Sequence, residues 1–258
     1  MRLPDNSNLS KSKKHRKKGK PVKIIYALGF FDGVHIGHQA LLETCRCQAG
    51  QTGCRTGVIT FDTHPLAFLT GKNPGLLTTA EDRDLLLHRN FRMETVVILP
   101  FPQVQNMPWR DFLAMMVQTH EAAGFVCGDD FRFGRKGEGN AALLEQFCRE
   151  QNFPFAMVPE QTLEGVRVSS THIRRLLEAG QMEEANRFLG HPHILSGTVK
   201  NNAISIPELL IAPREGTYLC RAEGRGLTVQ ILGRRVSLQG CTFPTGKWIT
   251  LEFLRETN

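Results

Sequence analysis

The chain of 258 residues has no apolar run as long as a membrane-spanning helix, which needs about 20 consecutive apolar residues. It also has no CxxC pair, because its seven cysteines (45, 47, 54, 127, 148, 220 and 241) are scattered. Cys45-x-Cys47 followed by Cys54 does not have the usual spacing of zinc ligands. We therefore expect reduced thiols in a cytoplasmic protein that has no membrane partner and no metal held by the protein itself.

Acidic residues are almost missing from the N-terminal region. Residues 1–23 hold nine Lys or Arg and one acid, a net charge of +8, whereas the whole chain has +7, so the remaining 235 residues sum to −1. We expect a disordered basic tail over 1–21. The tail lacks the apolar segment of a secretion signal. Weak electrostatic contacts with RNA or acidic surfaces are compatible with it, but no RNA-binding motif accompanies it and no specific nucleic-acid partner is expected.

Strand-like and helix-like patterns alternate along the chain after the tail. Apolar strand patterns cover 22–28, 56–61, 95–99, 124–127 and 155–158, and helical patterns cover 38–49, 79–90, 108–119, 141–151, 173–179 and 183–189. This alternation predicts an α/β fold with a Rossmann-like, doubly wound parallel sheet. Ligands of such sheets bind beyond the carboxyl ends of the strands. Short β-like runs follow Gly190, at 194–199, 209–211, 217–222, 227–232 and 248–254, and predict a small C-terminal β segment.

The most informative motif is GFFDGVHIGH, residues 29–38, directly after the first predicted strand. A glycine-rich turn between a strand and a helix presents backbone N–H groups to an anion. Residues three apart share one face of a helix, so His35 and His38 can approach the same phosphate. HxxH by itself is common and also fits an ordinary turn with two histidines. The ten-residue string after a strand favours a polyphosphate site.

A second anion-binding pattern lies at Ser169-Ser170-Thr171, before a helix that we expect to end at Gly180. Hydroxyl groups, helix N-terminal N–H groups and the donor fork of Arg174 suit a phosphate. A capped helix with exposed arginines explains the same string without a ligand. Beside the histidine motif, the ligand-binding interpretation is favoured.

Four further strings occur in a fixed order: TFDTHP (60–65), LLTT (76–79), GDDFRFG (128–134) and VSSTHIR (168–174). With GFFDGVHIGH they resemble the FMN adenylyltransferase module of bacterial bifunctional riboflavin kinase/FAD synthetases, within the HxGH nucleotidyltransferases. The resemblance covers residues 22 to about 190. It implies an FMN adenylyltransferase-like domain over 22–190, and a remnant of a riboflavin kinase β-barrel over 191–258.

The resemblance implies transfer of AMP from ATP to FMN, giving FAD and pyrophosphate, with Mg²⁺ carried by ATP. FMN would attack the α-phosphorus directly, so catalysis would depend on positioning and charge stabilisation. The implied catalytic residues are His35 and His38. The implied ATP contacts are Gly29, Phe30, Phe31, Gly37, His38, Ser170, Thr171 and Arg174, and the implied FMN contacts are Phe61, Asp62, His64, Asp130 and Phe133.

The chain departs from the family pattern at two places. Lys200-Asn201-Asn202-Ala203-Ile204 stands where the kinase PTAN motif is expected, and the C-terminal segment has about half the length of a kinase domain in this family. We therefore expect no riboflavin kinase activity. Thr63 replaces a proline in the FDTHP string, which puts the fit of FMN in doubt.

Two alternative functions remain open. A non-catalytic paralogue would bind flavin or nucleotide and use its altered C-terminal part, or the basic tail, for interaction. Another adenylyltransferase would keep the fold and act on a different phosphate acceptor, although GDDFRFG and FDTHP argue against that. The sequence does not predict the oligomeric state.

Overall fold

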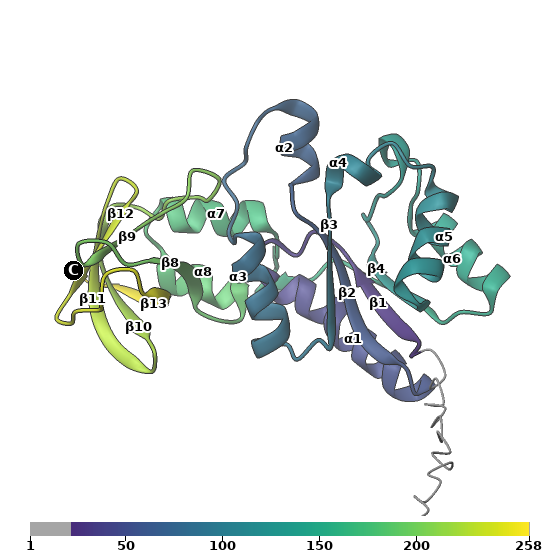
Figure 1. Ribbon diagram of the computed structural model, residues 1–258, viewed down its shortest axis with the longest axis horizontal. Helices are drawn as coiled ribbons and strands as arrows, with labels where there is room; N and C mark the ends of the chain where they lie inside the picture. Colours follow the sequence, from purple (N-terminus) through teal and green to yellow (C-terminus); the bar gives the residue numbers. More distant parts are fainter. Residues whose placement is uncertain (1–21, 258) are drawn as a thin grey trace, which may run out of the picture.

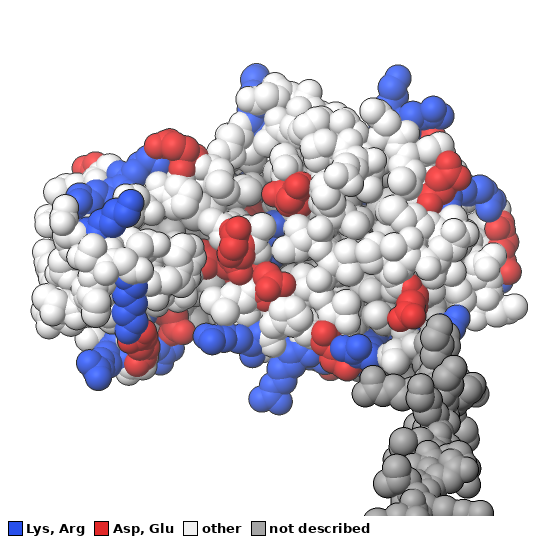
Figure 2. All heavy atoms as spheres, in the orientation of Figure 1, with Lys and Arg blue, Asp and Glu red and all other residues white. Residues whose placement is uncertain are grey.

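The computed structural model describes residues 22–257 (Figure 1). The predicted basic tail, 1–21, lies outside these residues. No helix within 22–257 has both the length and the hydropathy needed to cross a bilayer. On the face drawn in Figure 2, basic and acidic side chains are interspersed with large uncharged areas between them.

A parallel five-stranded sheet forms the centre of the larger part of the molecule. Its strands are β1 (Ile24–Leu28), β2 (Arg55–Phe61), β3 (Thr95–Leu99), β4 (Ala122–Gly128) and β5 (Phe155–Val158), in the order β3-β2-β1-β4-β5. All five agree with the predicted runs to within two residues at each end. The order reverses between β1 and β4, and ligands of open α/β sheets bind at such a switch point. The predicted α/β fold with a parallel sheet is therefore confirmed.

Helices cover both faces of the sheet, as the doubly wound prediction requires. The helices are α1 (Ile36–Thr52), α2 (Pro65–Thr70), α3 (Ala80–Leu85), α4 (Phe101–Val104), α5 (Trp109–His120), α6 (Ala141–Gln151), α7 (Ser170–Glu178) and α8 (Met182–Leu189), with short turns η1 (Asp32–Val34), η2 (Leu86–Asn90) and η3 (Arg135–Gly137). Side chains alternate along β1: Ile25 and Ala27 pack under α1 and η2, whereas Tyr26 and Leu28 pack under α5 and α6.

Local sequence explains where α7 begins and ends. Ser169 caps its N-terminus, because the Ser169 hydroxyl accepts a hydrogen bond from the His172 N–H at 3.2 Å. At the other end, Gly180 has φ +79° and donates to the Leu177 carbonyl, while Gln181 donates to the Leu176 carbonyl. This pair of hydrogen bonds is a Schellman motif, and it confirms Gly180 as the predicted end of the helix. The helix predicted at 79–90 differs in detail, since its second half, η2, widens into a π-helical turn.

The C-terminal part is a six-stranded antiparallel, barrel-like sheet (left in Figure 1). Its strands are β8 (His193–Thr198), β9 (Ala203–Ser205), β10 (Gly216–Ala222), β11 (Arg225–Leu232), β12 (Arg235–Gln239) and β13 (Trp248–Thr257). The prediction missed β9 and β12. The strand expected at 209–211 was wrong, because Leu210 makes only an isolated bridge to Leu76. A two-stranded hairpin, β6 (Thr162–Leu163) with β7 (Val166–Arg167), completes the fold.

The two parts share one hydrophobic core rather than meeting at a thin linker. Ile173 and Leu177 of α7 and Phe188 of α8 belong to the same buried cluster as Tyr218 and Phe253 of the C-terminal sheet. That cluster runs across the domain boundary expected after residue 190.

Candidate active site

The turn between β1 and α1 has an unusual backbone path. Phe31, Gly33 and Val34 all have positive φ angles, of 57°, 73° and 42°. At Gly33 a Cβ atom would lie 2.7 Å from Leu77 Cδ1, so only glycine fits there. The chain then becomes extended at His35, which caps the N-terminus of α1. The turn thereby directs the first N–H groups of α1 toward the carboxyl end of the sheet.

His35 and His38 form a stacked pair. Their ring centroids are 3.7 Å apart with an interplanar angle of 15°, and the ring of His38 also contacts Phe31 at 5.0 Å. His35 Nδ1 accepts a hydrogen bond from the His38 backbone N–H at 3.4 Å, which leaves the ring proton on Nε2. A Cβ atom on Gly37 would lie 3.2 Å from His35 Nδ1, so glycine here leaves room for the imidazole.

Both imidazoles are neutral near pH 7. Burial lowers the pKa of His35 to about 4 and holds the pKa of His38 well below its usual value. His38 Nδ1 is buried and has no hydrogen-bond partner among residues 22–257. An unpartnered buried polar atom costs free energy, and such atoms persist mainly where they serve a function.

A buried ion pair holds the turn from behind. Asp32 accepts hydrogen bonds from the N–H groups of Leu77 (2.8 Å) and Thr78 (3.2 Å), and it pairs with Arg174 Nη2 at 2.8 Å. Burial raises the pKa of Asp32, and the Arg174 charge opposes that rise. Arg174 Nε also donates to the Gly75 carbonyl at 2.6 Å. Arg174 therefore supports the turn instead of facing open space.

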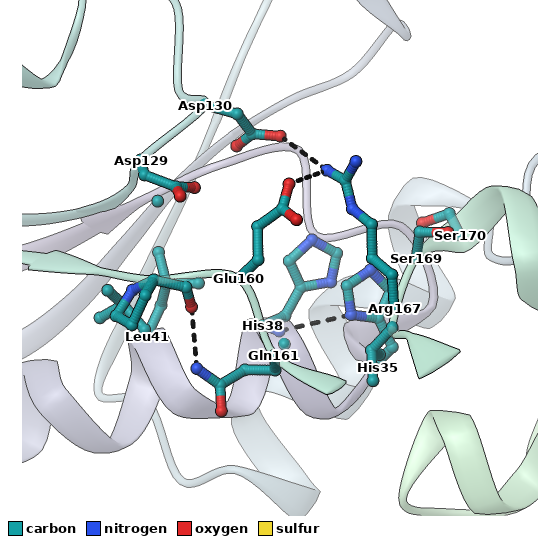
Figure 3. A pocket seen from close by; sticks show the side chains of 15 residues that line it. His35, His38, Leu41, Asp129, Asp130, Glu160, Gln161, Arg167, Ser169 and Ser170 are labelled. Carbon is teal, nitrogen blue, oxygen red and sulfur yellow. Dashed lines mark hydrogen bonds and ion pairs between the residues drawn. The ribbon is translucent and has the colours of Figure 1, made fainter. Parts of the chain in front are cut away.

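A polar cavity of about 240 Å³ lies beyond the switch point of the sheet (Figure 3). We call it the polar cavity. The starts of α1 and α7, the ends of β4 and β5 and the β6–β7 hairpin supply its lining, which comprises His35, Gly37, His38, Leu41, Gly128, Asp129, Asp130, Val158, Pro159, Glu160, Gln161, Arg167, Val168, Ser169 and Ser170. Two helix N-termini thus meet at one cavity, and each carries a partial positive charge. This arrangement attracts an anion with several charges, such as a polyphosphate.

The structure brings only some of the predicted ATP contacts to the polar cavity. His35, Gly37, His38 and Ser170 line it. The predicted contacts Gly29, Phe30 and Phe31 form the turn that leads to it, and Thr171 and Arg174 are not among its lining residues. The histidine pair and the serine end of the second motif therefore face the same space, whereas Arg174 points to Asp32.

Arg167 is a cavity residue that the sequence analysis missed. Its guanidinium group contacts the carboxylates of Glu160 and Asp130, the latter at 3.6 Å, and Figure 3 shows it extended above the imidazole pair. Arg167 directly precedes the VSSTHIR string, and this position is the signal by which the sequence could have identified it as a cavity residue. A half-exposed arginine with two surface carboxylates can exchange them for phosphate oxygens at little cost.

An apolar cavity of about 270 Å³ lies at the carboxyl ends of β2 and β3. We call it the apolar cavity. Its lining consists of Phe61, Pro65, Leu69, Phe101, Val104, Gln105, Asn106, Phe112, Arg132, Phe133, Gly134, Lys136 and Gly137. Phe61 meets Phe101 edge to face at 5.5 Å, and Phe131 stacks beside Phe133 at 5.6 Å. Walls of aromatic rings with few polar groups suit a flat, largely apolar ligand.

The five predicted FMN contacts fall in different places. Phe61 and Phe133 line the apolar cavity, whereas Asp130 lines the polar cavity. Asp62 caps a turn, since its carboxylate accepts a hydrogen bond from the Phe101 N–H at 3.0 Å. His64 caps α2 through its ring and meets Phe30 edge to face at 4.7 Å. Residues 128–130 line the polar cavity and residues 132–137 contribute to the apolar cavity, so one segment after β4 connects the two cavities at the carboxyl edge of the sheet.

Comparison with known proteins places this architecture in a family. The family model described as FAD synthetase matches residues 17–172. A bifunctional riboflavin kinase/FMN adenylyltransferase of Listeria monocytogenes is 34% identical over 230 residues, which cover 80% of this chain and 70% of the relative. An FAD synthetase of the same organism is 27% identical over 209 residues, 75% of this chain and 79% of the relative.

A solved structure supports the fold across both parts. The crystal structure of a protein from Streptococcus pneumoniae, described as a macrolide-efflux protein, superposes with a TM-score of 0.75 at 23% identity and covers 93% of this chain and 95% of that chain. At that identity the likeness concerns the fold alone. The matched family model covers more than half of the chain, and the Listeria relative matches over most of both proteins. The chain belongs to the FAD synthetase family.

Proposed function

We propose that this protein transfers AMP from ATP to FMN and releases FAD and pyrophosphate. The observation that carries the proposal is that one segment, 128–137, lines both the polar cavity and the apolar cavity. A polyphosphate in the first and a flavin ring in the second would bring two phosphates together at the turn 29–34. The names of the Listeria relatives support the same activity.

The polar cavity would hold the triphosphate. The N–H groups at the starts of α1 and α7 would meet its oxygens, and His35 Nε2–H would donate from a neutral ring. An oxygen of the FMN phosphate attacks the α-phosphorus, and the bond from the α-phosphorus to the oxygen bridging to the β-phosphate breaks. The electron pair leaves with pyrophosphate, so no protein nucleophile is needed. Fixed donors then stabilise the charge that grows on the phosphates.

The remaining ATP-site residues would act in two ways. Ser170 lines the cavity, and its hydroxyl donates to the Asp32 carbonyl at 3.2 Å, which ties α7 to the turn. Thr171 lies in the first turn of α7, where its N–H group belongs to the set without an intrahelical partner. Arg174 would keep the turn in place through Asp32. Arg167 would move from its carboxylates to the triphosphate.

The apolar cavity would hold the flavin ring between Phe61 and Phe133. Asp62 and His64 would act indirectly, because they fix the turn and helix that follow β2. Asp130, on the shared segment, would lie near the phosphates rather than near the ring.

A divalent cation, Mg²⁺, would arrive with ATP. Within residues 22–257 no three His, Cys, Asp or Glu side chains form a group that could hold a metal ion. Asp129 lines the polar cavity and makes no ion pair with another described residue, so its carboxylate would fit a cation carried mainly by phosphates. When bound, such a cation neutralises phosphate charge.

The proposal also includes the superfamily of the protein and the absence of a kinase activity. The histidine motif after β1 supports membership of the HxGH nucleotidyltransferases. The C-terminal sheet would lack riboflavin kinase activity, because residues 200–203 form a tight turn where a phosphate loop is expected. Asn201 and Asn202 have φ angles of 49° and 51°, and Lys200 and Ala203 bond to each other across the turn, as in a type I′ hairpin.

The test uses the full chain with FMN, ATP and MgCl₂, and separates FMN from FAD by chromatography. We expect FAD and an equal amount of pyrophosphate. No FAD at saturating substrates would overturn the proposal and favour the non-catalytic alternative. Pyrophosphate formed only with another phosphorylated acceptor would favour the other adenylyltransferase. A parallel incubation with riboflavin and ATP is expected to give no FMN.

A further inference from the structure

Arg83, in α3, is a buried cation that makes no short-range ion pair, and the charges of Asp32, Glu81 and Asp62 favour it only from farther away. Its side chain is 1% exposed, and it makes no ion pair within 4.0 Å with any residue of the described chain. Its Nη2 donates to the Phe61 carbonyl, but Nε and Nη1 are buried and have no hydrogen-bond partner within 22–257. Burial lowers the pKa of Arg83 only to about 10, so the group stays charged at neutral pH.

Arg83 contacts both ligand-binding regions. Its guanidinium carbon lies 4.4 Å from the ring centroid of Phe30, in the turn that leads to the polar cavity. Its hydrogen-bond acceptor, Phe61, is a wall of the apolar cavity. Phe30 and Phe61 are also linked through β2, because the Thr60 hydroxyl donates to the Phe30 carbonyl at 2.8 Å. Arg83 therefore lies behind the junction of the two cavities.

A buried charge of this kind costs stability. Burial of an unpaired cation is unfavourable, and replacement by an apolar side chain of similar volume is often neutral or stabilising. The stacking on Phe30, the single hydrogen bond and the more distant carboxylates offset only part of that cost, because the pKa of Arg83 is still lowered. Arg83 is therefore poorly explained as a structural residue.

We propose that Arg83 is a specificity-determining residue that favours a phosphorylated flavin over an unphosphorylated one. The inference rests on the proposed function, since it concerns the acceptor of that reaction. A flavin ring in the apolar cavity puts its side-chain phosphate at the junction, where the Arg83 charge acts through the Phe30 ring. Charges interact strongly across a layer from which water is excluded, so no direct contact is required. Riboflavin has no phosphate and gains nothing from this charge.

The test measures the binding of FMN and of riboflavin by quenching of flavin fluorescence, without ATP, so that it needs no turnover. We expect Arg83→Met to weaken FMN binding about tenfold, and riboflavin binding less than twofold. Arg83→Lys keeps the charge and is expected to retain most of the preference. Arg89→Met, on the exposed side of η2, removes the same charge at the surface and is the matched control.

Thermal unfolding separates this role from a structural one. We expect the melting temperature of Arg83→Met to equal or exceed that of the parent, while the preference for FMN falls. If Arg83→Met does not fold, Arg83→Gln provides the neutral variant. An unchanged ratio of the two dissociation constants would overturn the inference, and so would an equal loss of both ligands with a lower melting temperature. Failure of the parent protein to make FAD would count against the proposed function instead.

Discussion

The polar and apolar cavities are connected by the segment 128–137 at the carboxyl edge of the same sheet, yet they are built by different means. The polar cavity depends on backbone: two helices begin there, and the histidine pair is set by a turn with positive φ angles. The apolar cavity depends on side chains, mainly phenylalanine rings from β2, the segment after β3 and the segment after β4. We therefore expect substitutions in the polar cavity to change the rate, and substitutions in the apolar cavity to change the affinity for the flavin.

The largest expected effect is that of His38→Ala. Loss of one fixed donor at a site of growing charge lowers the rate by about 10²- to 10³-fold. We expect kcat to fall by this factor in the FAD-forming assay, with little change in KM for FMN. His120→Ala is the control, because His120 ends α5 at the opposite edge of the sheet. A tenfold rise in KM for FMN with kcat unchanged would show that the polar cavity determines flavin affinity and not the rate.

The second effect concerns stability and pH. Burial lowers the pKa of His35 and of His193 to about 4, against 6.5 for an exposed histidine. The unfolded chain therefore binds more protons between pH 6.5 and 4, and stability falls as the pH decreases through that window. Each residue accounts for about 3 kcal/mol of unfolding free energy lost by pH 4.

Urea unfolding at intervals from pH 7.5 to 4 measures this loss. His193→Leu, in β8, removes one such titration at a place away from the polar cavity, so we expect a shallower dependence on pH. An unfolding free energy that stays constant over the whole range would show that neither imidazole is held neutral by burial.

A third, smaller effect is expected in the apolar cavity. Phe133→Leu removes one aromatic wall of the apolar cavity, and an aromatic pair contributes about 0.5–1.5 kcal/mol beyond area burial. We expect KM for FMN to rise about three- to tenfold, while KM for ATP stays within twofold. Phe147→Leu on α6, packed in the same core cluster but outside the cavity, is the matched control. A larger rise in KM for ATP than in KM for FMN would contradict the assignment of Phe133 to the flavin.

The smallest effect is expected outside both cavities. Trp248 begins β13 and its side chain is 58% exposed. Trp248→Ser should change FAD formation less than twofold and stability by less than about 0.5 kcal/mol. A strong loss of activity would show that the C-terminal sheet takes part in substrate binding.

The parallel sheet was predictable because each of its strands is a short apolar run followed by a helical pattern. The ends of α7 were predictable because serine and glycine act locally there. The pair of Asp32 with Arg174 was not, since it joins residues 142 positions apart and neither neighbourhood indicates a partner. Arg174 was assigned to ATP for its chemistry, and only the fold shows that its Nε and Nη2 groups bond to Gly75 and Asp32.

The directions of the side chains in the GDDFRFG string were also not predictable from the sequence. Asp130 and Phe133 are three residues apart and were assigned to the same ligand, but they face different cavities. The chain turns between them, and side-chain direction in an irregular segment has no period from which to infer it. Arg83 was missed for a related reason: arginine is rarely buried without a partner, so its sequence position suggests an exposed helix face.

The segment 73–78 joins the two parts of the molecule. Leu76 exchanges backbone hydrogen bonds with Leu209 and Ile211 on one side, while its neighbours Leu77 and Thr78 hold Asp32 on the other. A protein cut after residue 190 would lose the outer half of this connection and uncover the apolar faces of α7 and α8. The C-terminal sheet thus serves as a mechanical support for the turn beside the polar cavity, because it anchors the segment that holds Asp32.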